Sequence, residues 1–309
     1  MSPSSSTGAV TKTLEQFVVD LAMGGTAAAI AKTTCAPLER TKLLLQVQHS
    51  QPTLAAHEKY KGIVDCLVRI PREQGLSAYW RGNFTNVARY FPTQALNFAF
   101  KDEFRKFFLA GVDKKDFWKF FAGSLAAGGC AGAVSLCFVY PLDFAMTRLA
   151  ADIGKCHGTR EFTGLKDCIA KIHAHDGMKG LYRGFSVSLQ GIVIYRAAYF
   201  GLYDTVKAEL MAKPEQMNFF VAWGLGMAVS ISAEISAYPW DTIRRRLMMQ
   251  SGRHRDGHEY TGTVDAVKSI IRNEGVRALY RGALANAVRA IGSGMVLALY
   301  DEFHKYVKI

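Results

Sequence analysis

Three short motifs each occur three times along this chain, in a single register. The first is a proline followed two residues later by an acid, and its copies begin at Pro37, Pro141 and Pro239, which lie 104 and 98 residues apart. The other two motifs are Gly-x4-aromatic-Arg-Gly and aromatic-x-Gly, and both repeat at spacings of 102 and 98 residues. Their copies are Gly75 to Gly82, Gly177 to Gly184, Gly275 to Gly282, Tyr60-Lys61-Gly62, Phe162-Thr163-Gly164 and Tyr260-Thr261-Gly262. A period of about 100 residues is far longer than a solenoid repeat, so each unit is predicted to be a block of several helices.

Each unit contains two long apolar stretches. Each stretch is about long enough to cross a hydrocarbon core of roughly 30 Å, but each also carries scattered polar or charged residues. Two interpretations compete: soluble helical repeats with amphipathic faces, or membrane helices whose polar residues line a wet interior. The segment 117–139, in which Lys119 is the only charge, favours the membrane. The six stretches run roughly over 15–38, 84–109, 117–142, 185–210, 219–239 and 283–303.

Small residues recur inside the first stretch of every unit. Gly24, Gly128 and Gly226 hold equivalent positions, and another small residue follows each of them four positions later. This spacing lets membrane helices approach closely. The proline of each unit comes at the end of the same stretch, where it is expected to kink or break the helix.

The composition narrows the choice of partner. The chain has 38 Lys and Arg against 26 Asp and Glu, a formal net charge of +12, which indicates an anionic partner: nucleic acid, an acidic lipid surface or a phosphorylated small molecule. With 50% hydrophobic and 21% charged residues, intrinsic disorder is excluded. The six cysteines form no C-x-x-C pair and no metal-ligand pattern, which indicates a reducing compartment or buried free thiols. We find no nucleophile-base pattern and no Walker loop, so neither an enzyme nor a cofactor is expected.

The order of these motifs resembles the mitochondrial carrier family. The signature of that family is Pro-x-[Asp/Glu]-x-x-[Lys/Arg], an intervening helix and Gly-x4-aromatic-[Lys/Arg]-Gly, three times over, and the match covers about residues 14 to 308. More narrowly, the segment 244–250 resembles the Arg-Arg-Arg-Met-Met-Met run that marks the ADP/ATP carriers of the family, with Leu247 in place of the first Met. The segments 89–98 and 191–203 are also similar to that subfamily.

The resemblance implies a fold and a location. It implies an all-α membrane protein with six tilted transmembrane helices in three pseudo-threefold repeats, and three short helices on the matrix side. The repeats are expected over 14–110, 115–210 and 216–308. The implied location is the mitochondrial inner membrane, with both termini in the intermembrane space, and the implied oligomeric state is a monomer.

The resemblance also implies a function, which is exchange of cytosolic ADP for matrix ATP by alternating access. The departures at Met146 and Leu247 leave open a related carrier of another phosphorylated or anionic solute. A soluble basic protein that binds nucleic acid is a third hypothesis. It is disfavoured by the apolar stretches and by the lack of a nucleic-acid-binding motif, so nucleic acid is not an expected partner.

Residues that recognise an asymmetric substrate should break the symmetry that the scaffold obeys. Equivalent positions in the second helix of each unit hold Arg89, Gly191 and Arg289. Arginines inside a membrane can pair with acidic neighbours or extend to the interface. Alternatively, the two arginines bind phosphates with their planar donor forks, while the gap over Gly191 and Ile192 admits a flat base. Because unpaired mid-helix arginines are costly and usually functional, we favour the second interpretation.

Two further features extend this predicted substrate site. Lys32 has no cation at either equivalent position, so it also breaks the symmetry. Tyr195, Tyr199 and Tyr203 recur every four residues and so share one helix face, where they either pack together or let Tyr195 stack on adenine. By resemblance, the residues that contact the nucleotide are Lys32, Arg89, Gly191, Ile192, Tyr195 and Arg289.

A basic run follows the third proline motif. Arg244, Arg245 and Arg246 could form a nuclear-localisation or nucleic-acid patch, but their register with the other repeats argues against a free surface tag. Successive residues on a helix face about 100° apart, so the three cannot share one role. Arg244 matches the signature cation, and the other two are expected to attract phosphates or to contact neighbouring helices.

Alternating access requires breakable contacts on each side of the membrane. On the matrix side the resemblance implies ion pairs between repeats, Lys42 with Asp241 and Asp143 with Arg244. Position 146 is a methionine where the signature has a cation, so Glu39 loses its expected partner. Either the gate is weaker there, or Arg148 or water satisfies Glu39. The expected matrix gate is Glu39, Lys42, Asp143, Asp241 and Arg244.

The cytoplasmic gate is expected from acid-cation pairs that recur near the end of each unit. The same residues could be solvated pairs three positions apart on a helix, and Asp301 with His304 is an alternative register in the last unit. Their threefold recurrence favours a gate. The expected residues are Asp102, Arg105, Asp204, Lys207, Glu302 and Lys305.

The glycines of the two aromatic-glycine motifs lie at expected helix starts. Free backbone N–H groups and the positive helix end suit a phosphate there, so an acidic phospholipid, by resemblance cardiolipin, is the expected occupant. The alternative is that the glycines only make tight turns. The expected lipid-binding residues are Gly62, Gly82, Gly164, Gly184, Gly262 and Gly282.

Overall fold

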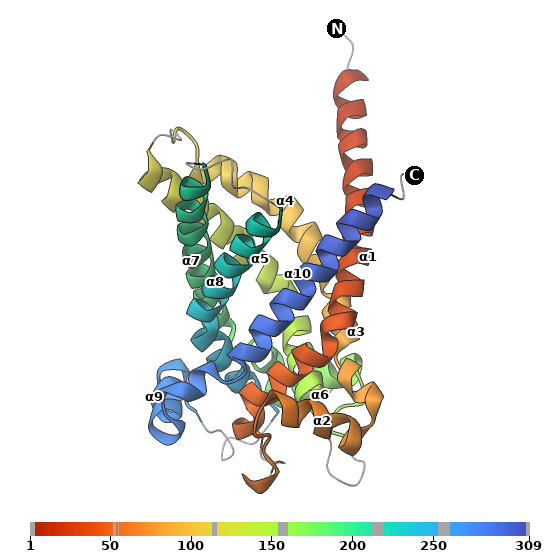
Figure 1. The fold of residues 1–309 in the computed structure, drawn as a ribbon, viewed down its shortest axis with the longest axis vertical. Coiled ribbons are helices and arrows are strands. Elements are labelled where there is room, and N and C mark those ends of the chain that lie inside the picture. The colour runs from red at the N-terminus through yellow and green to blue at the C-terminus, as the bar shows by residue number, and fades with distance from the viewer. Residues whose placement is uncertain are drawn as a thin grey trace.

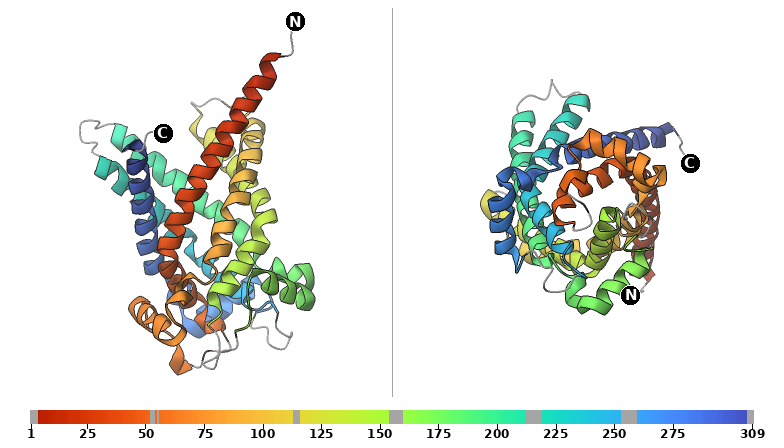
Figure 2. Two further views of the ribbon diagram at one scale, coloured as in Figure 1. Left: turned by 90° about the vertical axis from the view of Figure 1, so that its right-hand side faces the viewer. Right: turned by 90° about the horizontal axis from the view of Figure 1, so that it is seen from below.

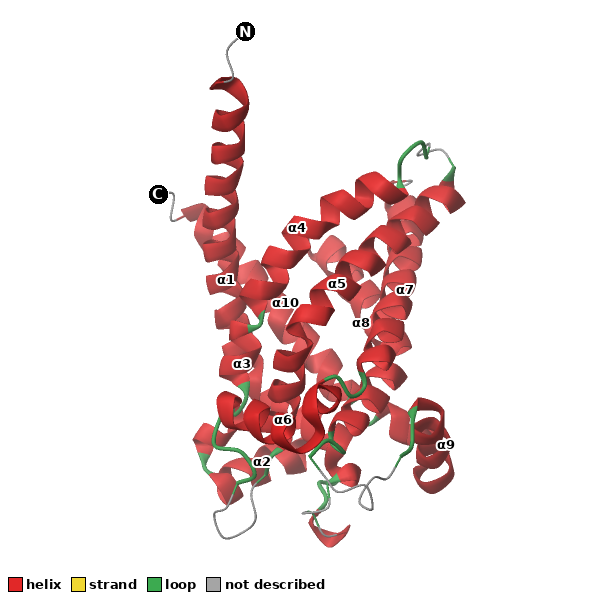
Figure 3. Cartoon of the chain, turned by 180° about the vertical axis from the view of Figure 1, so that it is seen from behind, coloured by secondary structure: helices red, strands yellow, loops and turns green. Residues whose placement is uncertain are grey.

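The computed structural model describes residues 4–51, 54, 56–112, 116–153, 160–211, 219–252 and 260–306. These residues are mostly helical, and there is no strand among them (Figure 3).

Six long helical segments follow one another along the chain, two in each repeat. Arg89 separates α3 from α4, so these two helices together make the second segment. The segments are α1 (Ser4–Val47), α3 (Asn83–Ala88) with α4 (Tyr90–Phe108), α5 (Phe117–Ala151), α7 (Phe185–Met211), α8 (Phe219–Met248) and α10 (Ala283–Tyr306).

Shorter helices join the two long segments of each repeat. They are α2 (Ile63–Gln74), α6 (Leu165–Leu181) and α9 (Thr263–Glu274). Single 3-10 turns η3 (Leu76–Trp80) and η6 (Val276–Tyr280) follow α2 and α9, and α6 bends at Gly177, where φ is 66°. The bend at Gly177 is therefore equivalent in position to Gly75 and Gly275, which directly precede the 3-10 turns of the other two repeats.

The long segments form a closed ring around one axis (Figure 2). Between repeats, α4 packs on α5, α7 packs on α8, and α10 returns to pack on α1. The start of α1 and the end of α10 lie at one end of this bundle, and α2, α6 and α9 lie at the other (Figure 1). The second helix of each repeat thus contacts the first helix of the next, which gives the arrangement its pseudo-threefold symmetry.

The prolines do not break the helices, although a break was one of the two expected outcomes. Pro37, Pro141 and Pro239 lie inside α1, α5 and α8, which continue to Val47, Ala151 and Met248. Burial accounts for the continuation, because side chains that follow each proline pack into the core and offset the cost of the interrupted helix. The prolines therefore bend long helices and do not terminate them.

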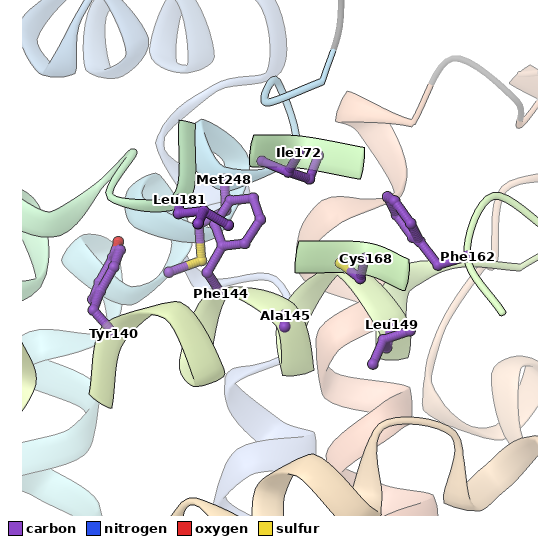
Figure 4. Close-up of a cluster of buried hydrophobic side chains, with 9 residues drawn as sticks. All are labelled: Tyr140, Phe144, Ala145, Leu149, Phe162, Cys168, Ile172, Leu181 and Met248. Atoms are coloured by element: carbon purple, nitrogen blue, oxygen red, sulfur yellow. The ribbon is translucent and has the colours of Figure 1, made fainter. Parts of the chain in front are cut away.

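Clusters of buried hydrophobic side chains lie at the end of the bundle that holds the short helices. In the second repeat, Tyr140 and Phe144 of α5 pack on Cys168, Ile172 and Leu181 of α6 (Figure 4). Comparable clusters join α1 to α2 and α8 to α9. Met248 of α8 joins the cluster of the second repeat, so this core also links neighbouring repeats (Figure 4).

The recurring small residues make room for side chains. A Cβ atom on Gly128 would lie 2.8 Å from the Arg196 guanidinium, and one on Gly24 would lie 3.4 Å from the Tyr90 hydroxyl. A Cβ on Gly226 would meet no atom within 4 Å. At Gly24 and Gly128 the space is taken by side chains of α4 and α7, and the close approach of helix backbones stays a prediction.

One helix among the described residues is long and apolar enough, by length and composition, to cross a membrane. This segment is Trp118–Ala151 in α5. The lower hydropathy of the other long segments agrees with the scattered polar residues noted in the sequence.

Candidate functional site

The cavities of the bundle bring several of the predicted substrate residues together. A cavity of about 400 Å³ between α4, α5 and α7 is lined by Arg89, Ile192 and Tyr195. A second one of about 510 Å³ adjoins it, because Arg196 and two other residues line both. A third, of about 200 Å³, lies between α7 and α8 and is lined by Gly191 and, again, Ile192 and Tyr195.

Arg89 reaches the cavity while forming an ion pair. Its Nη1 lies 2.7 Å from Oδ1 of Asp143, and its side chain remains 28% exposed. Asp143 is only 3% exposed and also accepts from Nη1 of Arg244 at 2.9 Å. One buried carboxylate therefore holds both a predicted substrate arginine and a predicted gate arginine.

Arg289 is arranged similarly in the third repeat. Its Nη2 lies 3.4 Å from Oε1 of Glu234, and its side chain is 25% exposed. Asn286 donates to the same carboxylate and accepts from Nε of Arg289 at 3.3 Å. Both predicted substrate arginines thus have the acidic neighbours that the alternative interpretation required, yet both stay accessible to an anion.

The hydrogen bonds of Lys32 identify Asn86 as a polar residue of the site that was not predicted from the sequence. Its Nζ donates to the backbone oxygen of Asn86 at 2.9 Å and to the side-chain oxygen at 3.3 Å. The buried Asn86 amide in turn donates to Oε2 of Glu39 at 2.7 Å. The signal was available, since Asn86 and Asn286 occupy equivalent positions three residues before Arg89 and Arg289.

The tyrosines of α7 stack on one another. The ring centroids of Tyr195 and Tyr199 lie 6.0 Å apart, as do those of Tyr199 and Tyr203, with interplanar angles of 27° and 8°. Tyr195 also lines two of the cavities, so packing and exposure to a ligand occur together. A Cβ on Gly191 would lie 3.3 Å from Cβ of Trp240, so this glycine also serves the contact between α7 and α8.

The three consecutive arginines have three different sets of partners. Arg244 binds Asp143 and lies 3.0 Å from Oδ1 of Asp241. Arg245 lies 3.1 Å from Oδ2 of Asp241. Arg246 is fully buried against Glu274, with Nη2 and Oε2 3.0 Å apart. Neither Arg245 nor Arg246 lines the three cavities described above, and Lys32 and Arg289 do not line them either.

Ion pairs between repeats cross the closed end of the bundle. Nζ of Lys42 lies 3.1 Å from Oδ2 of Asp241, which joins the first repeat to the third. The pair of Arg244 with Asp143 joins the third repeat to the second. Both ion pairs that the resemblance implied are therefore present.

At the seam between the first and second repeats the signature pair of Glu39 with position 146 is missing, although Arg89 with Asp143 and Arg81 with Asp152 also join these two repeats. Met146 is buried and packs on Leu43 and Ala150, and Glu39 accepts from Asn86 instead of from a cation. Arg148 was proposed as an alternative partner, but it donates to the backbone oxygen of Met249 at 2.7 Å and pairs with Glu161. The proposal that Arg148 satisfies Glu39 is therefore wrong.

Comparison with known proteins decides the family. The sequence matches the family described as "Mitochondrial carrier protein" over residues 14–111, 117–214 and 215–309. The chain belongs to the mitochondrial carrier family. It is 58% identical to "ADP/ATP translocase 2" of Rattus norvegicus over 291 residues, which cover 94% of this chain and 97% of the relative. It is also 58% identical to "ADP/ATP translocase 3" of Homo sapiens over 94% of this chain and 98% of the relative, and 55% identical to "ADP/ATP translocase 4" of Mus musculus over 95% and 91%.

The end of this carrier opposite the ion pairs holds the residues of the predicted cytoplasmic gate. Asp102 and Arg105 lie on α4 and are exposed, and Arg105 lines the cavity of about 510 Å³. The side chains of the remaining predicted members lie outside the described residues. These members are Asp204, Lys207, Glu302 and Lys305, together with the alternative pair Asp301 and His304.

The six predicted lipid-binding glycines of this carrier fall into two groups. Gly82, Gly184 and Gly282 have φ between 83° and 86°, and a Cβ on each would press on the backbone of the next repeat. At Gly62 and Gly164 the backbone is extended, with φ of 176° and −178°, and a Cβ would meet no atom within 4 Å. Gly262 behaves like these two. The first group is required by the fold, whereas nothing in the described chain requires glycine at the second.

This division predicts different responses to alanine within one repeat. In Gly184→Ala the new Cβ would lie 2.9 Å from the backbone oxygen of Arg244 in a left-handed conformation, so we expect a loss of roughly 1–3 kcal/mol of stability. Gly164→Ala should change stability by less than about 0.5 kcal/mol. Thermal unfolding of the purified variants in lipid-free detergent measures both, and equal losses at the two positions would contradict the division.

The remaining reactive groups show no metal site. The described residues contain no group of three or more His, Cys, Asp or Glu side chains that could hold a metal ion. The five described cysteines are free, and burial raises the pKa of both Cys66 and Cys168 to about 12. Such thiols are weak nucleophiles at neutral pH. Cys137 is exposed, and Cys156 lies outside the described residues.

Proposed function

We propose that this carrier exchanges ADP for ATP across the mitochondrial inner membrane by alternating access. The observation that carries the proposal is its 55–58% identity to ADP/ATP translocases over nearly the whole chain. The cationic cavities closed at one end agree with such a substrate. It acts as a transporter and not as an enzyme.

The family sets the proposed topology. All six long segments span the membrane in repeats 14–110, 115–210 and 216–308, with α2, α6 and α9 on the matrix side and both termini in the intermembrane space. The start of α1 and the end of α10 lie at one end of the bundle, and the short helices lie at the other (Figure 1). This arrangement supports the proposed orientation. The carrier works as a monomer.

The phosphates bind between Lys32, Arg89 and Arg289, with Arg244 closer to the matrix gate. The base enters the cavity of about 200 Å³ that Gly191 lines, where Ile192 and Tyr195 provide apolar and aromatic contacts. Two partly exposed arginines supply planar donor forks from the first and third repeats, which suits a chain of phosphates more than a single carboxylate. Arg245 and Arg246 add positive charge behind this site.

Binding is coupled to opening through shared carboxylates. Asp143 is paired with two cations, Arg89 and Arg244, and a phosphate that binds Arg89 breaks the first of these ion pairs. In the same way, a phosphate that binds Arg289 breaks the ion pair between Arg289 and Glu234. A ligand shifts a conformational equilibrium only through contacts that differ between the two states. Substrate bound at these arginines therefore weakens the matrix gate formed by Glu39, Lys42, Asp143, Asp241 and Arg244. The charged pairs Asp102 with Arg105, Asp204 with Lys207 and Glu302 with Lys305 then close the cytoplasmic side.

The missing cation at position 146 makes the matrix gate weaker than a gate in which every signature acid faces its signature cation. Met146→Arg would place a cation opposite Glu39, so we expect the cytoplasm-open state to gain about 1 kcal/mol and the unfolding temperature to rise by about 2–4 °C. The exchange rate should fall because opening toward the matrix then breaks one more pair.

The gain of Met146→Arg should vanish in a Glu39→Gln background, which keeps the size of the side chain and removes its charge. Thermal unfolding and liposome exchange measure both effects. Unchanged stability and unchanged rate in Met146→Arg would contradict the proposed role of position 146.

Cardiolipin binds at the starts of α2, α6 and α9. The open space over Gly62, Gly164 and Gly262 supports this proposal, because neither conformation nor packing explains glycine there. Free N–H groups at a helix start and the positive helix end favour a phosphate. Gly164→Ala should accordingly weaken cardiolipin binding while leaving stability in lipid-free detergent unchanged.

Reconstitution tests the proposed function. Liposomes loaded with ATP and containing the purified carrier should take up labelled ADP, and liposomes without internal nucleotide should not. Exchange of ADP for ATP moves one net charge, worth about 2.3 kcal/mol per 100 mV, so an imposed potential should bias the direction. Uptake of a carboxylate without uptake of ADP would replace the proposal with a carrier of another anionic solute.

A further inference from the structure

Each proline of the repeat leaves one backbone carbonyl without its usual helical donor. Proline has no N–H, so the carbonyl four residues earlier does not receive the regular helical hydrogen bond. Those carbonyls belong to Thr33 in α1, Cys137 in α5 and Ile235 in α8. In a helix that lies in hydrocarbon, such a group needs a partner from the protein itself.

The aromatic residue of the aromatic-Arg-Gly motif supplies that partner in two repeats. Nε1 of Trp80 donates to the backbone oxygen of Thr33 at 2.9 Å. The hydroxyl of Tyr182 donates to the backbone oxygen of Cys137 at 2.7 Å. The two side chains differ in shape and in donor atom, but they hold equivalent positions 102 residues apart and reach equivalent carbonyls. The two halves of the repeat motif therefore meet at one hydrogen bond.

A second hydrogen bond runs in the opposite direction in two repeats. The hydroxyl of Tyr140 in α5 donates to the backbone oxygen of Arg183 at 2.8 Å, and that of Tyr238 in α8 donates to the backbone oxygen of Arg281 at 2.9 Å. The first repeat has Ala36 at the equivalent position and cannot form this bond.

The repeats consequently differ in how many of these bonds they have. The first repeat depends on Trp80, the second has both bonds, and the third depends on Tyr238. The ring of Tyr280 stacks on Tyr238 with centroids 6.4 Å apart, and within the described part of the chain its hydroxyl has no hydrogen-bond partner. Tyr280 is therefore a natural control, because it has the aromatic ring at the equivalent position but does not donate a hydrogen bond to the carbonyl.

We propose that Trp80 and Tyr182 are positioning residues that fix the proline bends of α1 and α5. Glu39 and Asp143 follow these prolines by two residues, so the direction of each bend sets where the gate carboxylate points. Neither Trp80 nor Tyr182 lines a cavity described above, and each uses its polar atom on a backbone carbonyl of its own repeat, so both act through the position of the helix. The transport part of this inference rests on the proposed exchange of ADP and ATP, whereas its stability part does not.

Trp80→Phe tests the first repeat, because it keeps an aromatic ring and removes the donor. Loss of one hydrogen bond should lower the unfolding temperature by about 2–4 °C and the exchange rate at saturating ADP by roughly three- to tenfold. The KM for ADP should stay within about twofold, since the substrate residues are untouched. Trp80→Tyr should restore both values toward wild type, as tyrosine serves at the equivalent position of the second repeat.

The second repeat provides a graded test with smaller substitutions. Tyr182→Phe alone should have a smaller effect than Trp80→Phe, because Tyr140 still ties α5 to the motif turn. The double variant Tyr140→Phe with Tyr182→Phe should lose more than the two single variants together. Tyr280→Phe is the matched control and should leave stability and turnover unchanged.

The outcomes separate this inference from the proposed function. A wild-type protein that fails to exchange nucleotide refutes the proposed function but leaves the stability comparison valid. Wild-type stability and turnover in Trp80→Phe would overturn the inference, and so would an equal loss in Tyr182→Phe and Tyr280→Phe. If Trp80→Phe does not fold, the tyrosine series still decides between these results.

Discussion

Replacing both Arg89 and Arg289 with alanine should abolish ADP/ATP exchange. A hydrogen bond to a charged group contributes about 1.5–3 kcal/mol, so each arginine is expected to account for roughly a 10- to 100-fold effect, and the pair for more than about a 10²-fold loss. Arg89 lines the cavity of about 400 Å³, Arg289 comes from another repeat, and their side chains remain 28% and 25% exposed, which leaves both available to phosphate. Exchange of labelled ADP in ATP-loaded liposomes measures the loss.

The control for this experiment must remove two positive charges elsewhere. Lys106 and Lys119 are suitable, because each pairs with an acid three residues away and their side chains are 73% and 74% exposed. Lys106→Ala with Lys119→Ala should retain near-normal exchange. Arg289→Lys should fall between wild type and Arg289→Ala, since lysine keeps the charge but loses the planar fork. Retained exchange in the double arginine variant would refute the proposed phosphate site.

The broken symmetry of the sequence predicted where to look for the substrate site. Position 89 and its equivalents carry two arginines and one glycine. In the structure Arg89 and Tyr195 line the cavity of about 400 Å³, and Gly191 lines the cavity of about 200 Å³. The sequence could not predict that each arginine already has a carboxylate partner. Asp143 lies 54 residues from Arg89, and only the packing of the second repeat against the first brings them together.

The polar residues that connect the site to the gate were harder to predict. Asn86 and Asn286 obey the symmetry in two repeats, so a search for departures from symmetry passes over them. Arg196 is a charge within an apolar stretch of the sequence, but its place beside Gly128 depends on the approach of α7 to α5. A repeat pattern predicts equivalent positions well, and it does not predict which side chains fill the space between repeats.

The ends of the long helices were predicted least well. The apolar stretches stop near Pro37, Pro141 and Pro239, but the helices continue as far as the core formed with α2, α6 and α9. The residues after the prolines mix charged and apolar side chains, and their burial depends on contacts with other repeats. Tertiary packing therefore extends helices beyond the point at which local sequence signals end them.

Neutralising Asp143 should disrupt both stability and transport. Its carboxylate is 3% exposed and binds Arg89 and Arg244 at 2.7 and 2.9 Å, so Asp143→Asn leaves two cations without their main acid at the second repeat. Removing one partner of a buried ion pair costs about 3–5 kcal/mol, which corresponds to a fall in unfolding temperature of roughly 6–12 °C or more. Thermal unfolding in detergent and liposome exchange should both show the loss.

Two comparisons separate the role of Asp143 in the gate from a general effect of removing a carboxylate. Glu103→Gln, at an exposed pair with Lys106, should cost under about 1 kcal/mol. Adding Arg244→Gln to Asp143→Asn should cost less than the sum of the single changes, because the second substitution removes a cation that the first has already left unpaired. Additive losses, or wild-type exchange in Asp143→Asn, would mean that this carboxylate does not join the substrate arginine to the gate. Coupling between binding and opening would then have to pass through Asn86 and Glu39.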